Sequence, residues 1–249
     1  MARTVAIGDI HGEIAHLDKL LGRLPELQAG DTIVFLGDFI DRGPHSAEVV
    51  ARVRELEKTS KAKIVSLRGN HEDAWLQVAD EGWAEFILPR TNGCLEALRS
   101  FRGEPAPADD EVPTADEFKA MFDASFIPKD VLDWMRALPF FYEDEHAIYV
   151  HAGLLHKAGK FLHPSVTEPK RALLWTRDRK FFSEYRGKLV IVGHTATVLL
   201  PPELSTFTPE DPADLWAGPA VIAIDTACGK PGGFLTAVEL PGKLCYESR

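Results

Sequence analysis

Five short motifs in this sequence carry aspartate, histidine and asparagine side chains, which are oxygen and nitrogen ligands of catalytic divalent metals. They read GDIHG, GDFIDRG, RGNHE, HAG and GHT, and they occupy residues 8–12, 37–43, 68–72, 151–153 and 193–195. Each motif follows an apolar run that is typical of a buried strand. Because α/β folds place their sites at the carboxyl ends of strands, we expect these side chains to converge. Together they could hold two metal ions, an arrangement suited to phosphate ester chemistry.

The spacing of these residues divides the predicted ligands between two ions. Asp9 and His11 are separated by one residue in a turn, so both can approach one ion. Asp38 ends the neighbouring strand, and its two carboxylate oxygens can bridge two metals. Open positions at each ion would be filled by water, as catalytic sites require. The first ion would take Asp9, His11 and Asp38, and the second would take Asp38, Asn70, His151 and His194.

The elements that must position these ligands alternate between strand and helix at the start of the chain. Residues 4–8, 32–37 and 64–67 are predicted to be buried strands, and a ligand-rich turn follows each of them. Apolar residues at helical spacing follow in 14–24, and Pro44 marks the start of a second helix. This order predicts a βαβαβ arrangement with a parallel sheet, which belongs to the α/β class.

The segment from about 75 to 138 differs from the rest of the chain. It combines helical patterns with polar loops, and Thr114 with Glu117 forms a capping box at the start of one predicted helix. It contains none of the five motifs, and predicted metal ligands lie on both sides of it. We therefore predict a single domain over residues 1–249, with a helical insertion at about 75–138 that borders the active face.

Strand patterns return after Pro139. A hairpin is predicted from residues 140–142 and 147–150, and residues 189–192 form a strand that leads into the GHT motif. Three further runs are predicted to be closing strands, at residues 221–224, 234–238 and 244–246.

Composition excludes some classes of function. The formal net charge of −10 over 249 residues argues against a nucleic-acid surface, which needs clustered lysine and arginine. Three cysteines lie far apart without CxxC spacing, which suits a reducing compartment and buried or inert thiols. The sequence contains neither a signal-like segment nor an apolar run of membrane-spanning length. We therefore expect a cytoplasmic protein without a nucleic-acid or membrane partner.

In this order and with these separations, the five motifs resemble the calcineurin-like metallophosphoesterase superfamily. The DRG and RGNHE forms resemble its PPP-type subgroup, the bacterial and phage serine/threonine protein phosphatases. Matching positions run over residues 8–195, and residues 225–235 resemble the closing strands of the family. The resemblance implies a four-layer α/β/β/α sandwich, phosphoester hydrolysis, and two divalent metal ions, Mn²⁺ before mixed iron and zinc. The remaining histidines are interpreted as structural: His16, His45, His146, His156 and His163.

The expected chemistry is a direct in-line attack on phosphorus by a water molecule that two cations activate. The leaving alkoxide then needs a proton, and His71 is placed to donate it because it directly follows the predicted ligand Asn70. Asp41 could orient and charge that imidazole. The resemblance assigns these roles to His71 and Asp41. The alternative for Asp41 is a turn residue that pairs with Arg42.

Three arginines are predicted to bind substrate phosphate, because a planar guanidinium can bind two phosphate oxygens at once. Arg42 lies in the DRG turn, and Arg68 directly precedes Gly69 and Asn70. Arg177 lies two residues after Trp175, which resembles a pattern in phage and bacterial members of the family. The alternative for Arg68 is an ion-pair partner beside a turn.

Four functions fit the pattern to different degrees. The favoured one is dephosphorylation of phosphoserine or phosphothreonine in proteins, with phosphotyrosine as a further substrate. The second is a symmetrical dinucleoside tetraphosphatase, a neighbouring branch that usually has a small residue in place of the DRG aspartate and GNHD in place of GNHE. Asp41 and Glu72 take the protein-phosphatase forms.

The third function is a phosphodiesterase or nuclease, whose family members more often lack the DRG arginine. The fourth is a phosphate-binding module without catalytic activity, and the complete set of predicted ligands argues against it. The insertion would set the specificity by bordering either a wide groove or a closed nucleotide pocket. Its aromatic residues are interpreted as core rather than as base-stacking platforms, namely Trp83, Phe86, Phe101 and Trp134.

Overall fold

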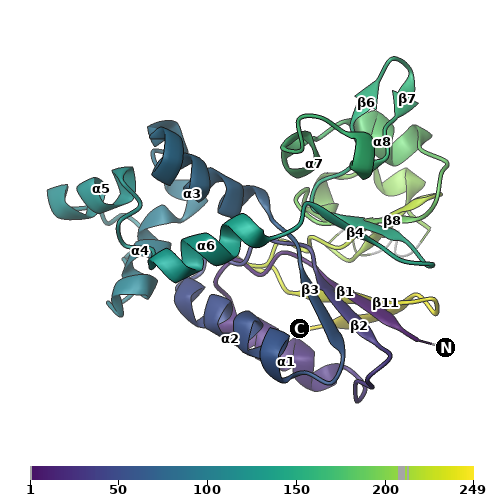
Figure 1. The fold of residues 1–249 in the computed structure, drawn as a ribbon, viewed down its shortest axis with the longest axis horizontal. Helices are drawn as coiled ribbons and strands as arrows, with labels where there is room; N and C mark the ends of the chain where they lie inside the picture. Colours follow the sequence, from purple (N-terminus) through teal and green to yellow (C-terminus); the bar gives the residue numbers. More distant parts are fainter. Residues whose placement is uncertain (1, 207–210, 212) are drawn as a thin grey trace.

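Two five-stranded sheets lie face to face at the centre of the protein (Figure 1). The computed structural model describes residues 2–206, 211 and 213–249. The first sheet has the order β12-β11-β1-β2-β3, in which β1, β2 and β3 are parallel and β11 and β12 are antiparallel to their neighbours. Its strands are β1 Thr4–Ile7, β2 Thr32–Phe35, β3 Lys63–Ser66, β11 Thr236–Leu240 and β12 Leu244–Glu247. The predicted βαβαβ start of the chain is confirmed.

The second sheet has the order β4-β5-β8-β10-β9. β5, β8 and β10 are parallel, and the edge strands β4 and β9 are antiparallel to their neighbours. Its strands are β4 Phe141–Glu143, β5 Ile148–Val150, β8 Val190–Val192, β9 Trp216–Ala217 and β10 Val221–Ala223. The predicted hairpin is present as β4 and β5. A separate small hairpin joins β6 His156–Lys157 to β7 Lys160–Phe161.

Helices cover the outer faces of both sheets and build the segment between β3 and β4 (Figure 1). The predicted capping box begins α5, where the Thr114 side chain accepts the N–H of Glu117 and the Glu117 side chain accepts the N–H of Thr114. The α-helices are α1 Ile14–Arg23, α2 Ser46–Thr59, α3 Asn70–Glu81, α4 Cys94–Arg102, α5 Ala115–Phe122, α6 Lys129–Ala137, α7 Ala172–Trp175 and α8 Arg179–Glu184. Single 3₁₀ turns lie at η1 Ala84–Phe86, η2 Arg90–Asn92, η3 Pro164–Val166, η4 Thr197–Leu199 and η5 Pro202–Leu204.

The alternation of side chains along the strands explains the layers. In β2, Ile33 and Phe35 pack toward α1 and α2, whereas Val34 packs against the second sheet, because successive side chains point to opposite faces. In the second sheet, Ile191 packs toward the first sheet, whereas Val190 packs in the core that also contains the α8 side chains. The order of layers is therefore helix, sheet, sheet, helix, which confirms the predicted α/β/β/α sandwich.

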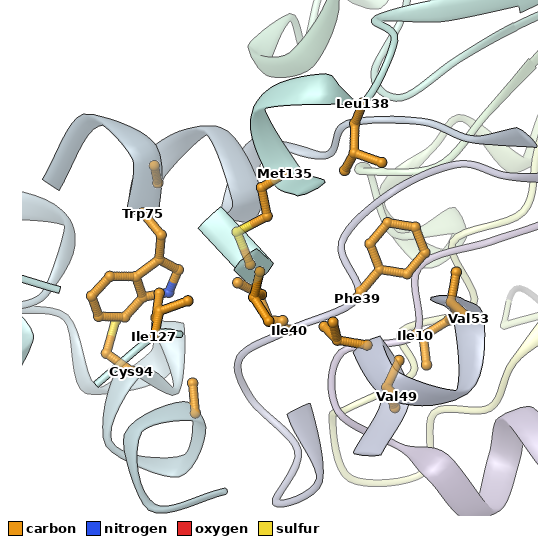
Figure 2. Packing of buried hydrophobic residues seen from close by; sticks show 14 of the residues in the cluster. Ile10, Phe39, Ile40, Val49, Val53, Trp75, Cys94, Ile127, Met135 and Leu138 are labelled. Carbon is orange, nitrogen blue, oxygen red and sulfur yellow. The ribbon is translucent and has the colours of Figure 1, made fainter. Parts of the chain in front are cut away.

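The predicted helical insertion shares a core with the first helical layer. Figure 2 shows Phe39 and Val49 of the N-terminal part in one packed cluster with Met135 and Leu138 of the segment between β3 and β4. Trp75 and Met135 are both fully buried in this cluster. Continuous burial supports our proposal that the chain is one domain with an insertion, because separate domains would each enclose a core of their own.

Within the part of the chain that the structure describes, no helix is both long enough and apolar enough to cross a membrane. Cys94 and Cys228 are buried free thiols, and Cys245 is a partly buried one. Burial raises the pKa of the Cys94 thiol well above its ordinary value, so the thiol stays protonated and inert.

Candidate metal centre

The turn after β1 brings His11 into a buried site between the two sheets. The side chain is fully buried, and its Nδ1–H donates to the carbonyl oxygen of Ile40 at 2.9 Å. The lone pair of the neutral ring therefore lies on Nε2. Among the described residues, this Nε2 has no hydrogen-bond partner, and it lies 3.4 Å from Oδ2 of Asp38. A buried ring nitrogen that is unpaired and faces a carboxylate has the arrangement that a metal ligand requires.

Asp38 lies between two groups of nitrogen and oxygen atoms. Its Oδ2 is 3.4 Å from Nε2 of His11, and its Oδ1 is 3.6 Å from Nε2 of His151. The backbone N–H of His71 also donates to Oδ1 at 3.0 Å, which fixes the rotation of the buried carboxylate. Each oxygen of Asp38 thus faces a different imidazole, as a ligand shared by two ions would have to do.

The second group of atoms gathers around Asn70, the first residue of α3. Its side-chain oxygen lies 2.9 Å from Nε2 of His151 and 2.7 Å from Nδ1 of His194. The Nδ1–H of His151 donates to the carbonyl oxygen of Leu36 at 2.9 Å, so the lone pair of this neutral ring lies on Nε2. That lone pair faces the oxygen of Asn70, and a cation between the two atoms would remove their repulsion.

The charge state of the buried histidines favours metal binding. Burial lowers the pKa of His11, His151 and His194 below the ordinary value of histidine. These imidazoles are therefore neutral near pH 7, and the neutral ring is the form that binds metals. Within two sets, each of which includes Asp38, the potential ligand atoms lie within 4.8 Å of one another: His11, Asp38 and His71, and Asp38, His151 and His194.

Asp9 adds a second buried carboxylate beside this cluster. Its oxygens accept the backbone N–H of His194 at 3.0 and 3.2 Å. The close approach depends on Gly193, where a Cβ atom would lie 2.0 Å from Oδ1 of Asp9. Burial, Asp225 and Asp38 all raise the pKa of Asp9 well above its ordinary value. Buried carboxylates that crowd together in this way are stabilised by a cation, so the donor set fits divalent metals.

Asp225 belongs to the same carboxylate cluster, although we did not predict it as a site residue. It follows β10, is 3% exposed, and accepts the backbone N–H of Ala227 at 2.9 Å. A strand-end signal is present in the sequence, because an apolar run at residues 221–224 leads directly into Asp225. No histidine or glycine motif surrounds Asp225, so the sequence does not distinguish a site residue from an ordinary turn residue at this position.

His71 and Asp41 form a buried pair at the edge of the cluster. Nδ1 of His71 donates to Oδ2 of Asp41 at 2.7 Å, and its Nε2 lies 4.0 Å from Oδ2 of Asp38. Burial alone would lower the pKa of His71, but Asp38 and Asp41 together raise it above its ordinary value. This imidazole therefore retains a proton more readily than the other buried histidines, as a proton donor must.

Glu72 organises the loops that carry the predicted ligands. Its two carboxylate oxygens accept three backbone N–H groups, those of Asp38, Phe39 and Gly69, each at 2.9 Å. Burial and the nearby charge of Asp38 raise the pKa of Glu72 to about 7. From the sequence alone, we used Glu72 only to distinguish the protein-phosphatase branch from the tetraphosphatase branch. A glutamate at the third position of a helix can accept the N–H of the residue that precedes the helix, here Gly69, and this signal could have identified its structural role.

The three arginines that were predicted to bind phosphate differ in their surroundings. Arg42 is half-buried, and its charge partly offsets the rise in pKa that burial causes in Asp9 and Asp225. Arg177 is exposed, and its charge helps to lower the pKa of His194, although burial of that ring has the larger effect. Both arginines therefore lie near the centre, where a phosphate group could reach them.

Arg68 is held by other groups. Its guanidinium donates to the carbonyl oxygen of Arg136 at 2.6 Å, lies 3.7 Å from Asp73, and stacks over the ring of Phe140 at 4.6 Å. These contacts match the alternative of an ion-pair partner beside a turn. A role for Arg68 in phosphate binding stays a prediction, and it would require the side chain to leave this arrangement.

Several predicted site residues have a strained backbone. A positive φ is costly for residues other than glycine, and such strain concentrates at functional sites. The turns after β1, β2 and β8 each contain at least one of them. The predicted site residues with positive φ are His11 at 49°, Asp38 at 54°, Asp41 at 70°, Arg42 at 64° and His194 at 64°.

Comparison with known proteins identifies the family to which this site belongs. The sequence profile of the calcineurin-like phosphoesterases matches residues 2–198. The chain belongs to this family. The buried groups of histidine and aspartate that could hold a metal ion lie within the matched residues.

Relatives of this calcineurin-like phosphoesterase fall into two groups. A symmetrical bis(5'-nucleosyl)-tetraphosphatase of Janthinobacterium sp. (strain Marseille) is 30% identical over 152 residues, which are 61% of this chain and 44% of that protein. A putative serine/threonine-protein phosphatase of Caenorhabditis elegans is 41% identical over 69 residues, which are 26% of this chain and 18% of that protein. The chain thus spans less than half the length of these relatives.

A solved structure of a putative diadenosine tetraphosphatase has the same fold. It superposes with a TM-score of 0.60 at 23% identity, covering 99% of this chain and 92% of that chain. A yeast (Saccharomyces cerevisiae) serine/threonine phosphatase superposes with a TM-score of 0.53 at 17% identity, covering 97% and 73%. At these identities the superpositions establish the fold alone.

Proposed function

We propose that this phosphoesterase hydrolyses phosphomonoesters at a centre of two divalent ions, with Mn²⁺ as the ion that the nitrogen and oxygen donor set suits before iron or zinc. Bound there, the two ions would supply positive charge to the phosphate oxygens and to the attacking water. The first ion would be held by Asp9, His11 and Asp38, and the second by Asp38, Asn70, His151 and His194.

One observation carries this proposal, namely the position of Asp38. Its two oxygens face His11 and His151 at 3.4 and 3.6 Å, and the contacts of Asn70 and His194 continue the second group. A single buried carboxylate between two clusters of lone pairs is suited to two ions and would be unsuited to one. The neighbouring pair of His71 and Asp41 then lies beside the place where a phosphate ester would bind.

Other predicted site residues would bind the substrate or donate a proton to it. Arg42 and Arg177 would bind phosphate oxygens and stabilise the charge that grows during transfer, and Arg68 would join them only after leaving its present contacts. His71 would donate the proton on Nε2 to the leaving oxygen, while Asp41 holds the opposite ring nitrogen.

The hydrogen bond from His71 to Asp41 supports protein phosphoserine and phosphothreonine as substrates. Their leaving group is an alkoxide, which needs a proton as the bond to phosphorus breaks. A proton donor that is held in place, as His71 is by Asp41, is therefore of greatest use with such a substrate. We include a cytoplasmic location in this proposal, in line with the free and unreactive thiols.

A symmetrical dinucleoside tetraphosphatase is the second candidate. The relative with 30% identity over 61% of this chain carries that name, and the solved structure that covers 99% of the chain is that of a putative diadenosine tetraphosphatase. In such a reaction the leaving group is a nucleoside diphosphate, which departs as a stabilised anion with less need of a proton. The two candidates thus differ in how much they depend on His71.

The test uses metal-stripped protein that has been resupplied with Mn²⁺, and it compares phosphate release from a phosphoserine peptide with nucleoside diphosphate release from diadenosine tetraphosphate. We expect hydrolysis only after Mn²⁺ is added, with the peptide cleaved faster. Faster cleavage of the dinucleotide would replace the first candidate with the second. Binding of Mn²⁺ without hydrolysis of either substrate would contradict both and favour a phosphate-binding module.

A further inference from the structure

Trp75 makes a contact with the predicted proton-donating pair that the sequence did not predict. It lies in α3 four residues after His71, so both side chains project from the same face of the helix. The indole Nε1–H donates to the carboxylate of Asp41, at 2.9 Å from Oδ1 and 3.0 Å from Oδ2. His71 donates to Oδ2 of the same carboxylate at 2.7 Å. Asp41 thus accepts hydrogen bonds from His71 and Trp75, which lie on the same face of α3.

The carboxylate of Asp41 depends on these two donors. The side chain is fully buried, and its backbone has a φ of 70°. Ser46 accepts the backbone N–H of Asp41 at 2.9 Å, which anchors the main chain but leaves the carboxylate free to rotate. Among the described residues, Trp75 and His71 are the side chains whose hydrogen bonds to this carboxylate are observed. Without the indole, the hydrogen bond from His71 would be the one that remains of these two.

The Trp75 ring is itself held in place by packing. Its side chain is fully buried, and the rings of Phe86 and Phe126 pack edge-on against it at centroid distances of 5.7 and 4.9 Å. Figure 2 shows the ring in the core beside Cys94, with its nitrogen on the side that faces away from that residue. Phe86 also contacts the His71 ring edge-on at 5.4 Å. The indole is therefore a rigid donor.

We propose that Trp75 is a positioning residue that acts on His71 through Asp41. The indole N–H keeps the Asp41 carboxylate in the orientation that accepts Nδ1–H of His71, so that Nε2 stays aimed at the leaving oxygen. The role rests on the proposed function, because it matters only if His71 donates a proton. We assign this role to the N–H group, and phenylalanine tests the assignment because it keeps an aromatic ring at this position and removes the donor.

The test compares phenyl phosphate with 4-nitrophenyl phosphate as substrates of the Mn²⁺-loaded protein. Phenolate leaves poorly without a proton, whereas the nitro group stabilises 4-nitrophenolate. In Trp75→Phe, we expect kcat on phenyl phosphate to fall about tenfold, the effect of losing one hydrogen bond to a charged group. KM on phenyl phosphate and kcat on 4-nitrophenyl phosphate should change little. The ratio of kcat on phenyl phosphate to kcat on 4-nitrophenyl phosphate does not depend on the folded or metal-loaded fraction, because both rates come from one preparation.

Trp134→Phe is the matched control. The Trp134 indole also donates to a carboxylate, that of Glu57 at 3.1 Å, but Glu57 is not part of the metal centre. Loss of this hydrogen bond in Trp134→Phe should leave the ratio of the two rates unchanged. In an Asp41→Ala background, Trp75→Phe should cause no further change in that ratio, because the carboxylate through which the indole N–H acts on His71 has been removed.

A measurement without catalysis tests the contact itself. In ¹⁵N–¹H spectra of the metal-free protein, the indole N–H signal that disappears in Trp75→Phe should move in Asp41→Asn and stay in place in Glu57→Gln. Equal slowing of both substrates by Trp75→Phe, or no slowing of either, would overturn the positioning role. Inactivity of the unmodified protein on both substrates would overturn the proposed function and this role with it.

Discussion

At the scale of single residues, the buried cluster combines histidines whose pKa is lowered with one histidine whose pKa is raised. Burial lowers the pKa of His11 and His194, which leaves them neutral and able to bind a cation. His71 is just as buried, but the hydrogen bond to Asp41 and the charge of Asp38 raise its pKa. The same residue type thus has two opposite pKa shifts, because the nearest carboxylate differs in distance and geometry.

Asp38→Asn and His71→Asn should both reduce turnover of phenyl phosphate, and they should do so for different reasons. Asp38→Asn removes a charge between the two ions, so bound Mn²⁺ should fall together with the rate by about 100-fold or more. His71→Asn should keep Mn²⁺ and lose about 100-fold in the rate on phenyl phosphate, where the proton is needed.

Circular dichroism should show both variants folded, and His45→Asn, on an exposed ring that pairs with Glu48, should serve as the unaffected control. Rates near that of the unmodified protein in both site variants would contradict the mechanism.

At the scale of elements, the first turns of α3 bring together three separate tasks. Asn70 begins the helix with a predicted ligand, His71 follows with the predicted proton donor, and Glu72 reaches back to the loops after β2 and β3. One turn later, Trp75 holds Asp41. A helix is suited to this because it fixes the relative directions of neighbouring side chains.

Glu72→Gln should weaken Mn²⁺ binding by about 10- to 100-fold, as is typical when a group that orients metal ligands is replaced. An amide has one acceptor oxygen in place of two, and its NH₂ group would face a backbone N–H. Titration calorimetry with Mn²⁺ measures the effect. Glu81→Gln, on an exposed carboxylate of the same helix, should bind Mn²⁺ normally. Equal affinity in both variants would show that Glu72 does not organise the site.

At the scale of the whole molecule, the centre lies where the two sheets meet. The first sheet supplies Asp9, Asp38 and Asn70 from the ends of β1, β2 and β3, and the second supplies His151 and His194 from the ends of β5 and β8. Far from the site, Arg3 joins Asp31, which precedes β2, to Glu239 of β11, at 2.5 and 3.5 Å. The fold is therefore held at the opposite side by charges that the reaction does not use.

Asp31 should make stability depend on acidity. Its hydrogen bond with Arg3 lowers the pKa of the buried carboxyl from 3.8 to about 2, so the folded state is favoured above pH 3.8 and loses this advantage as pH falls through 2. Relative to Asp31→Asn, we expect the unmodified metal-free protein to be more stable by about 2 kcal/mol at pH 7 and by about half of that near pH 3. Urea unfolding measures both values, and a pH-independent difference would contradict the argument.

Much of the fold and the predicted site followed from local patterns. Apolar runs before Asp9, Asp38 and Asn70 predicted three parallel strands, and the structure has them. The role of these three residues as metal ligands stays a prediction. Local patterns could not predict that Arg68 turns away to Arg136 and Phe140. That outcome depends on a residue 68 positions away in the chain, which sequence spacing does not bring near.

The types and order of the residues were enough to predict the family and the α/β fold, because short motifs and strand ends are properties of short segments. The tertiary structure decided which groups support them. Asp225 joins the carboxylate cluster, Glu72 binds three N–H groups, and Trp75 holds Asp41 only because segments far apart in the chain pack together. Such contacts form when separate elements share one buried space, and their geometry is set by packing rather than by local propensity.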